Sequence, residues 1–86
     1  MNTEIDFLAR VDAFVDGVFR DRKCIAEVSE AQGAQFVEAL REKARGHYSG
    51  KYSIEEVQEE GRNLIYQLQR ISSENFERKF SYSENL

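Results

Sequence analysis

The chain has 86 residues, of which 41% are hydrophobic and 12% aromatic, and its 16 acidic and 12 basic side chains give a net charge of −4. A chain of this length forms one small domain, and its excess of acid opposes non-specific attraction to nucleic acid or anionic lipid. The single cysteine, Cys24, excludes an internal disulfide, and the lack of an apolar stretch of bilayer length excludes a membrane span, so we expect a cytoplasmic protein.

The first predicted helix covers residues 4–19, and Thr3 is placed to cap its N-terminus. The apolar side chains of this segment recur at helical spacing and cover nearly half of the circumference. They are Ile5, Phe7, Leu8, Val11, Phe14, Val15, Val18 and Phe19. A face of this width requires two neighbouring elements. After the charged residues 20–23, we predict a loop for residues 24–28.

The second predicted helix covers residues 30–45. Ser29 and Gln32 have the spacing of a capping box, in which both side chains accept hydrogen bonds from backbone N–H groups at the helix start. The apolar stripe that follows is narrow and consists of Gly33, Phe36, Val37, Leu40 and Ala44. Basic side chains in the last turns suit the helix dipole, and Gly46 is predicted to end the helix.

The third predicted helix covers residues 54–72. Ser53 and Glu56 form a second capping box, and Tyr52 is placed to pack onto Val57 as a hydrophobic staple. The helix carries an apolar seam whose members lie three or four residues apart: Ile54, Val57, Gly61, Leu64, Leu68 and Ile71. Because glycine weakens a helix interior, a glycine in the seam indicates close approach of another backbone or a large side chain.

The short connector of residues 46–52 predicts that the second and third helices form an antiparallel hairpin. With the first helix they make an all-α three-helix bundle, which we assign to a domain of residues 1–72. Residues 73–86 are predicted to be a C-terminal tail. Ser73 is placed to start a short helix in this tail, which docks on the bundle, on a second copy or on another protein.

The sequence offers little for catalysis or for cofactor binding. Cys24 and His47 are the single thiol and the single imidazole, and they lie on separate predicted connectors. A lone cysteine is usually a small apolar filler, and a histidine after a helix end is favoured by the exposed carbonyl groups there. No ligand spacing for a metal and no phosphate-binding glycine loop is present. We therefore expect no enzyme, no metal site and no cofactor.

Four glutamates at the start of the third helix, Glu55, Glu56, Glu59 and Glu60, form what we call the acidic set. Like charges one helical turn apart cost about 0.2–0.5 kcal/mol per pair, so the set requires a compensating interaction. One interpretation is that the hairpin brings basic side chains of the second helix beside these glutamates. The other is that the set is an anionic surface that steers a partner protein with a basic surface.

Arg41, Lys43, Arg45 and Lys51, which we call the basic set, are interleaved with Tyr48 and Tyr52 and carry the alternative hypothesis of nucleic-acid binding. Against it, the connector is longer than the turn of a helix-turn-helix motif. The glutamates at the start of the third helix would also face phosphates. Nucleic acid is therefore the less favoured partner.

Three aromatic residues complete the candidate binding surface. Tyr66 falls off the apolar seam, and Phe76 and Phe80 lie four residues apart in the tail, where one side of a short helix presents both rings. Aromatic side chains bury a large area at small entropic cost and are favoured at interfaces, although core packing is the usual role of phenylalanine.

These observations predict a small acidic helical protein that acts by binding another protein, as an inhibitor, immunity-type antidote, adaptor or regulatory subunit. The wide apolar face of the first helix and the seam of the third exceed what one monomer of this size needs, so we also expect a homodimer. The alternative is a small nucleic-acid-binding regulator that uses the basic set.

Overall fold

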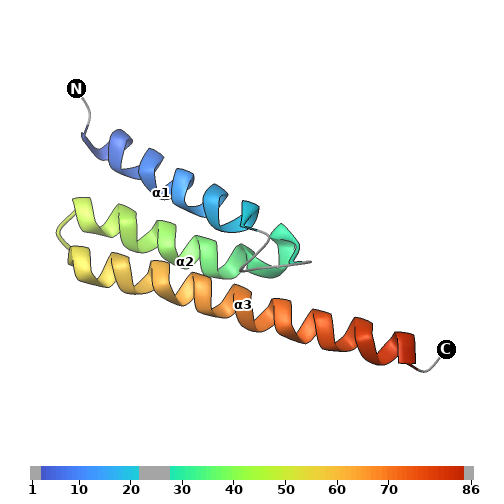
Figure 1. The fold of residues 1–86 in the computed structure, drawn as a ribbon. Coiled ribbons are helices and arrows are strands. Elements are labelled where there is room, and N and C mark those ends of the chain that lie inside the picture. The colour runs from blue at the N-terminus through green and yellow to red at the C-terminus, as the bar shows by residue number, and fades with distance from the viewer. Residues whose placement is uncertain (1–2, 22–27, 85–86) are drawn as a thin grey trace.

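The structure is a computed structural model that describes residues 3–21 and 28–84, with side chains up to residue 79. Within these ranges the chain forms three α-helices and no strand: α1 (Thr3–Arg20), α2 (Glu30–Tyr48) and α3 (Ile54–Glu84) (Figure 1). The predicted all-α three-helix bundle is therefore confirmed. The loop predicted for residues 24–28 lies outside the described residues except for Val28, which is not helical.

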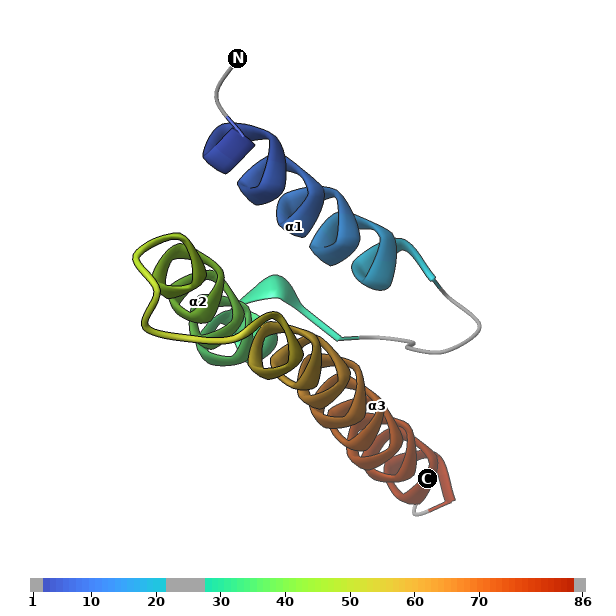
Figure 2. The same ribbon diagram turned by 90° about the vertical axis from the view of Figure 1, so that its left-hand side faces the viewer.

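α2 is the middle helix of the bundle and packs against both of the others. It runs antiparallel to α1 and to α3, so α1 and α3 run in the same direction (Figures 1 and 2). The antiparallel α2–α3 hairpin is the pairing that the short connector predicted. Because α3 is much longer than α2, it projects past the start of α2, and the molecule measures 57 × 21 × 18 Å.

The core lies along the middle of the bundle and draws buried side chains from all three helices. They are Val11, Val15, Val37, Leu40, Ala44, Val57, Leu64 and Leu68. Leu64 and Leu68 of the predicted seam are fully buried, with 0% of their surface exposed. Ile54, the first residue of the seam, is exposed, so the seam is covered in its centre and open where α3 begins.

Both predicted capping boxes are present. The backbone N–H of Gln32 donates to Ser29 Oγ (3.3 Å), and the N–H of Ser29 donates to Gln32 Oε1 (3.2 Å). At the start of α3, the N–H of Glu56 donates to Ser53 Oγ (3.2 Å) and the N–H of Ser53 donates to Glu56 Oε2 (3.3 Å). The N-termini of α2 and α3 are thus determined by local hydrogen bonds, as the spacing of these residues predicted.

The prediction that Gly46 ends the second helix is wrong. α2 continues to Tyr48, and the chain turns at Gly50, whose positive φ of 81° is a conformation that glycine adopts without strain. The N–H of Lys51 donates to the Gly46 carbonyl (2.8 Å) and the N–H of Gly50 to the His47 carbonyl (3.2 Å), the hydrogen bonds of a Schellman motif. Gly46 instead makes room for a ring, because a Cβ there would overlap the side chain of Tyr52.

Residues 73–84 form no separate short helix, because α3 continues through Ser73 to Glu84. Contacts with α2 and along α3 explain the continuity. The side chain of Ser72 is buried, and Asn75 Nδ2 donates to Gln32 Oε1 (3.1 Å) at the start of α2. Arg70 and Glu74 form an ion pair (2.8 Å) across the predicted boundary. The predicted helix in the tail is therefore present, but it is the end of α3 and not a separate helix.

Candidate protein interaction surface

The acidic set is divided between internal contacts and solvent. Glu56 belongs to the capping box of α3, and Glu60 Oε1 lies 3.8 Å from Lys43 Nζ of α2. Glu55 and Glu59 are exposed and form no ion pair within the described residues. The hairpin therefore brings one basic side chain of α2, Lys43, to the acidic set. That the set steers a partner protein with a basic surface stays a prediction, and it now rests on Glu55 and Glu59.

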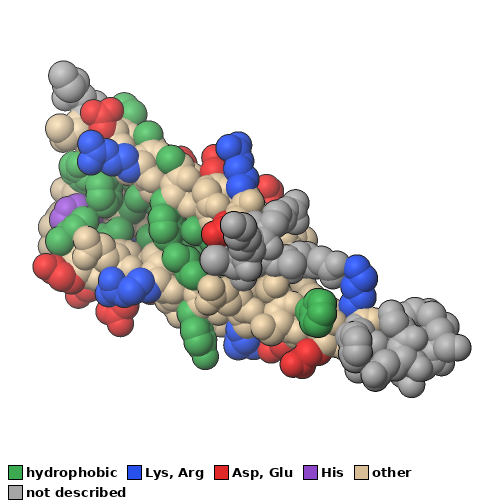
Figure 3. Space-filling model, viewed as in Figure 1, with side chains coloured by type: hydrophobic (Ala, Val, Ile, Leu, Met, Phe, Trp, Pro, Cys, Tyr) green, Lys and Arg blue, Asp and Glu red, His purple; other side chains and the backbone are tan. Residues whose placement is uncertain are grey.

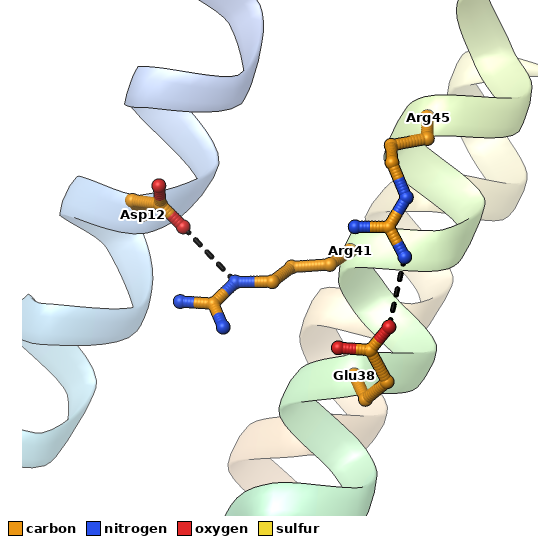
Figure 4. A network of polar contacts seen from close by, with 4 residues as sticks. All are labelled: Asp12, Glu38, Arg41 and Arg45. Atoms are coloured by element: carbon orange, nitrogen blue, oxygen red, sulfur yellow. Dashed lines mark hydrogen bonds and ion pairs between the residues drawn. The ribbon is translucent and has the colours of Figure 1, made fainter.

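Most of the basic set is paired with carboxylates of the same chain (Figure 4). Arg41 Nε lies 3.1 Å from Asp12 Oδ1 of α1, and an Nη atom of Arg45 lies 2.8 Å from Glu38 Oε1 within α2. Lys43, besides its contact with Glu60, places its ammonium group 4.9 Å from the centre of the Tyr52 ring. A nucleic-acid phosphate therefore competes with these carboxylates for Arg41, Lys43 and Arg45.

His47 takes part in packing at the end of α2. Its ring centroid lies 5.5 Å from that of Phe7 on α1 and 5.7 Å from that of Tyr48, and its Nδ1 lies 3.0 Å from the Tyr52 carbonyl oxygen. Tyr48 Oη donates to the Thr3 carbonyl (2.8 Å), which joins this end of α2 to the start of α1. Cys24, the other residue that a cysteine–histidine pair requires, lies outside the described residues.

The aromatic candidates on α3 are mostly exposed. Tyr66 is 62% exposed and Phe76 is 63% exposed, so the Phe76 ring does not fill the core. The side chain of Phe80 lies outside the described residues. Tyr66 belongs to the part of α3 that runs alongside α2. Asn75 of α3 bonds to Gln32 in the first turn of α2, so Phe76, the next residue, belongs to the part of α3 that projects past α2.

A groove with mostly hydrophobic walls lies between α1 and α3, and the sequence reasoning did not find it. Its volume is about 570 Å³, and we call it the α1–α3 groove. It is lined by Phe7, Arg10, Val11, Phe14, Leu40, Ile54, Val57, Gln58, Gly61, Arg62 and Ile65. Figure 3 shows hydrophobic side chains gathered between α1 and the α2–α3 hairpin. The groove is open along its edges, where Phe14 and Ile54 are 40% and 37% exposed.

Two arginines stand at the edges of the α1–α3 groove. Arg10 belongs to α1 and Arg62 to α3, and both are exposed. Neither forms an ion pair or a hydrogen bond with another side chain in the described part of the chain. No carboxylate lines the groove. These guanidinium groups therefore differ from those of Arg41 and Arg45, which their own chain already neutralises.

A second hollow lies between α1 and α2 and has a volume of about 620 Å³. Its lining mixes acidic and basic side chains with apolar ones: Val15, Asp16, Phe19, Arg20, Glu30, Ala34, Val37, Glu38 and Arg41. Arg41 and Glu38 are engaged in ion pairs, and the other charged side chains of the lining, Asp16, Arg20 and Glu30, are of both signs, so this hollow offers less apolar surface than the α1–α3 groove and no single sign of charge. It is the weaker candidate for a docking site.

Two signals in the sequence pointed toward the α1–α3 groove without locating it. The first helix has an apolar face too wide for one neighbour, and α2 covers only part of it. Gly61 indicated close approach of a large group, and the Phe14 ring does lie beside it, but a Cβ built there would lie 3.5 Å from the ring, an ordinary van der Waals contact that does not require glycine. The missing information was which two faces come together, since that depends on how α1 sits on the hairpin.

Within residues 3–21 and 28–84 no group of three or more histidine, cysteine, aspartate or glutamate side chains is placed to hold a metal ion. None of the helices in these ranges combines the length and apolarity needed to cross a bilayer. No protein-family model, curated protein sequence or solved structure matches the chain.

Proposed function

We propose that this protein is a non-enzymatic protein-binding module that works as an inhibitor, antidote, adaptor or regulatory subunit. The observation that carries the proposal is the α1–α3 groove, whose apolar walls are open to solvent although the chain has a packed core of its own. Contiguous apolar surface of this kind on a small folded domain typically marks a protein interaction site.

The distribution of polar contacts supports the same proposal. Most candidate groups for other activities, namely His47, Arg41, Lys43 and Arg45, have partners within the chain that hold the helices together. The apolar edges of the groove, by contrast, remain uncovered in the described residues. The cytoplasmic location and the homodimer stay predictions, and the dimer is one of the outcomes that the following experiment separates.

A site-specific photo-crosslinker tests the proposal. The probe replaces Ile65, which lines the groove, and in a control chain it replaces Gln35, an exposed residue of α2 that lines neither hollow. Irradiation in a lysate of the native host is expected to give adducts with another protein from position 65 and not from position 35. Equal adducts from both positions, or none from position 65, would overturn the proposal. An adduct between two copies of this chain from position 65 would replace it with a homodimer.

A further inference from the structure

We infer that the α1–α3 groove binds an amphipathic helix of a partner protein whose apolar side is flanked by carboxylates. This inference rests on the proposed function and names the chemistry of the partner. It follows from the charges at the edges of the groove and from the shape of the bundle around it.

The charge at the groove is opposite in sign to that of the whole molecule. The chain carries a net charge of −4, yet the charged side chains that line the groove are Arg10 and Arg62, one on each wall. Exposed arginines at the edge of an apolar surface bind carboxylates through paired N–H donors. A partner with acidic side chains on both sides of an apolar strip satisfies both walls at once.

The shape of the groove favours a helix as the occupant. Its walls are two helices that run in the same direction, and its floor is Leu40 of the middle helix α2. The lining of α3 extends from Ile54 to Ile65, about 16 Å at 1.5 Å per residue, which matches about three turns of a docked helix. A fourth helix laid along α1 and α3 completes a four-helix bundle, a common way to cover such a face. A small molecule is less suited, because pockets for small molecules enclose most of their ligand and this groove is open along its edges.

A second copy of the chain is a poorer occupant than an acidic helix. In a two-fold symmetric dimer the same face meets itself, so the arginines of both grooves gather along one interface. The lining of the groove contains no carboxylate to separate them, and the exposed acids one helical turn away, Asp6 before Arg10 and Glu59 before Arg62, lie outside it. Repulsion among four guanidinium groups opposes that arrangement, whereas carboxylates of a different protein relieve it.

The experiment uses two synthetic amidated peptides of about 18 residues, a length at which a designed helix becomes stable. Both carry leucines at helical spacing on one side; glutamates flank this strip in the first peptide and lysines in the second. Fluorescence anisotropy with the full chain at low salt measures both affinities. We expect the glutamate peptide to bind roughly tenfold more tightly, and we expect added salt to narrow the difference.

Two double variants make the test specific. R10E/R62E reverses the charge of the groove and is expected to reverse the order of the two peptides. R20E/R78E makes the same change in net charge at exposed arginines outside the groove and is expected to keep the original order. Circular dichroism checks that each variant stays helical. Because Arg10 and Arg62 form no ion pair and no side-chain hydrogen bond within the described residues, their replacement breaks no polar contact there.

The outcomes separate the inference from the proposed function. Equal binding of both peptides, or an unchanged order in R10E/R62E, would overturn the acidic helix and leave the groove as a protein-binding site. If neither peptide binds while crosslinking from position 65 still captures another protein, the partner has a different chemistry and the inference falls. A further outcome is that sedimentation shows the chain to be a dimer and I65D to be a monomer. That result would assign the groove to a second copy of the chain and overturn the inference.

Discussion

The two interfaces of α2 differ in how completely they are closed. Toward α3, Leu64 and Leu68 are fully buried, and the backbone of Gly33 lies against Leu68. Toward α1, the buried residues are two valines, while Phe14 and Ile5 on the same helix stay exposed. The α2–α3 hairpin is therefore the more completely buried part of the fold, and α1 is a partly covered helix whose open apolar side forms one wall of the α1–α3 groove.

This difference shows how a small chain combines stability with a binding surface. A core that buried every apolar residue of α1 would leave no groove, and a hairpin with exposed leucines would lack the stability to hold one. The free energy of unfolding is small in a domain of this size. A few well-packed residues of the hairpin therefore determine whether the chain stays folded while apolar side chains of α1 are exposed.

The largest expected change in stability comes from a substitution in the closed interface between α2 and α3. Leu64→Ala removes a fully buried side chain and leaves a cavity, which costs about 2–5 kcal/mol in the free energy of unfolding. Phe14→Ala, on the open side, is expected to cost about 1 kcal/mol because much of its ring is already in water. Urea denaturation of both variants measures the difference. Equal losses would show that the two interfaces are equally important for stability.

The next effect concerns Gly33, where α2 comes closest to its neighbours. A Cβ at this position lies 2.8 Å from Leu68 Cδ2 and 2.9 Å from Phe19 Cζ. Because Leu68 is fully buried, it has little room to move, and we expect Gly33→Ala to lower the free energy of unfolding by about 1–2 kcal/mol despite the better helix propensity of alanine. A gain in the urea midpoint of this variant would show that the contact is looser than the structure indicates.

Gly61 provides the opposite case on the groove side. A Cβ at this position lies 3.5 Å from the Phe14 ring, which is ordinary van der Waals contact, so Gly61→Ala fits without displacing a neighbour. The better helix propensity of alanine is expected to raise the free energy of unfolding by up to about 1 kcal/mol. Thermal unfolding measures the gain, and Gly17→Ala, at an open position of α1 with nothing within 4 Å, is the matched control. A lower melting temperature for Gly61→Ala alone would contradict the prediction.

The smallest effect is expected for the ion pair that joins α1 to α2. Asp12→Asn removes the charge that Arg41 contacts at 3.1 Å, but both side chains are about half exposed. Such pairs contribute about 0–1 kcal/mol, and salt screens them further. The urea midpoint of this variant should lie close to that of the unchanged chain, with the gap closing as salt is added. A large loss would mean that charge, and not packing, holds α1 in place.

Local patterns predicted the fold well where short-range hydrogen bonds decide it. Ser29 with Gln32 and Ser53 with Glu56 correctly located the starts of α2 and α3, and the spacing of Leu64 and Leu68 identified the buried side of α3. The interpretation that the hairpin pairs the acidic set with basic side chains of α2 is supported for one pair, Lys43 with Glu60.

The wrong predictions concern features that depend on distant contacts. Gly46 is a plausible helix end in the sequence, but in the structure it packs under Tyr52 and the chain turns at Gly50 instead. Ser73 is a reasonable helix start in isolation, but Asn75 of the same segment bonds to Gln32 far away in the chain and keeps α3 continuous. The α1–α3 groove depends on how two separate helices are placed, which no local pattern encodes.

The length of α3 has a further consequence for how the molecule loosens on heating. Past Asn75, where α2 begins alongside, residues 76–84 extend the helix by about 14 Å without that neighbour. Helix ends open more readily than buried helix interiors, because their backbone hydrogen bonds are the most exposed to water. Fraying is therefore expected to proceed from Glu84 toward Asn75 and to slow where α2 begins to pack against α3.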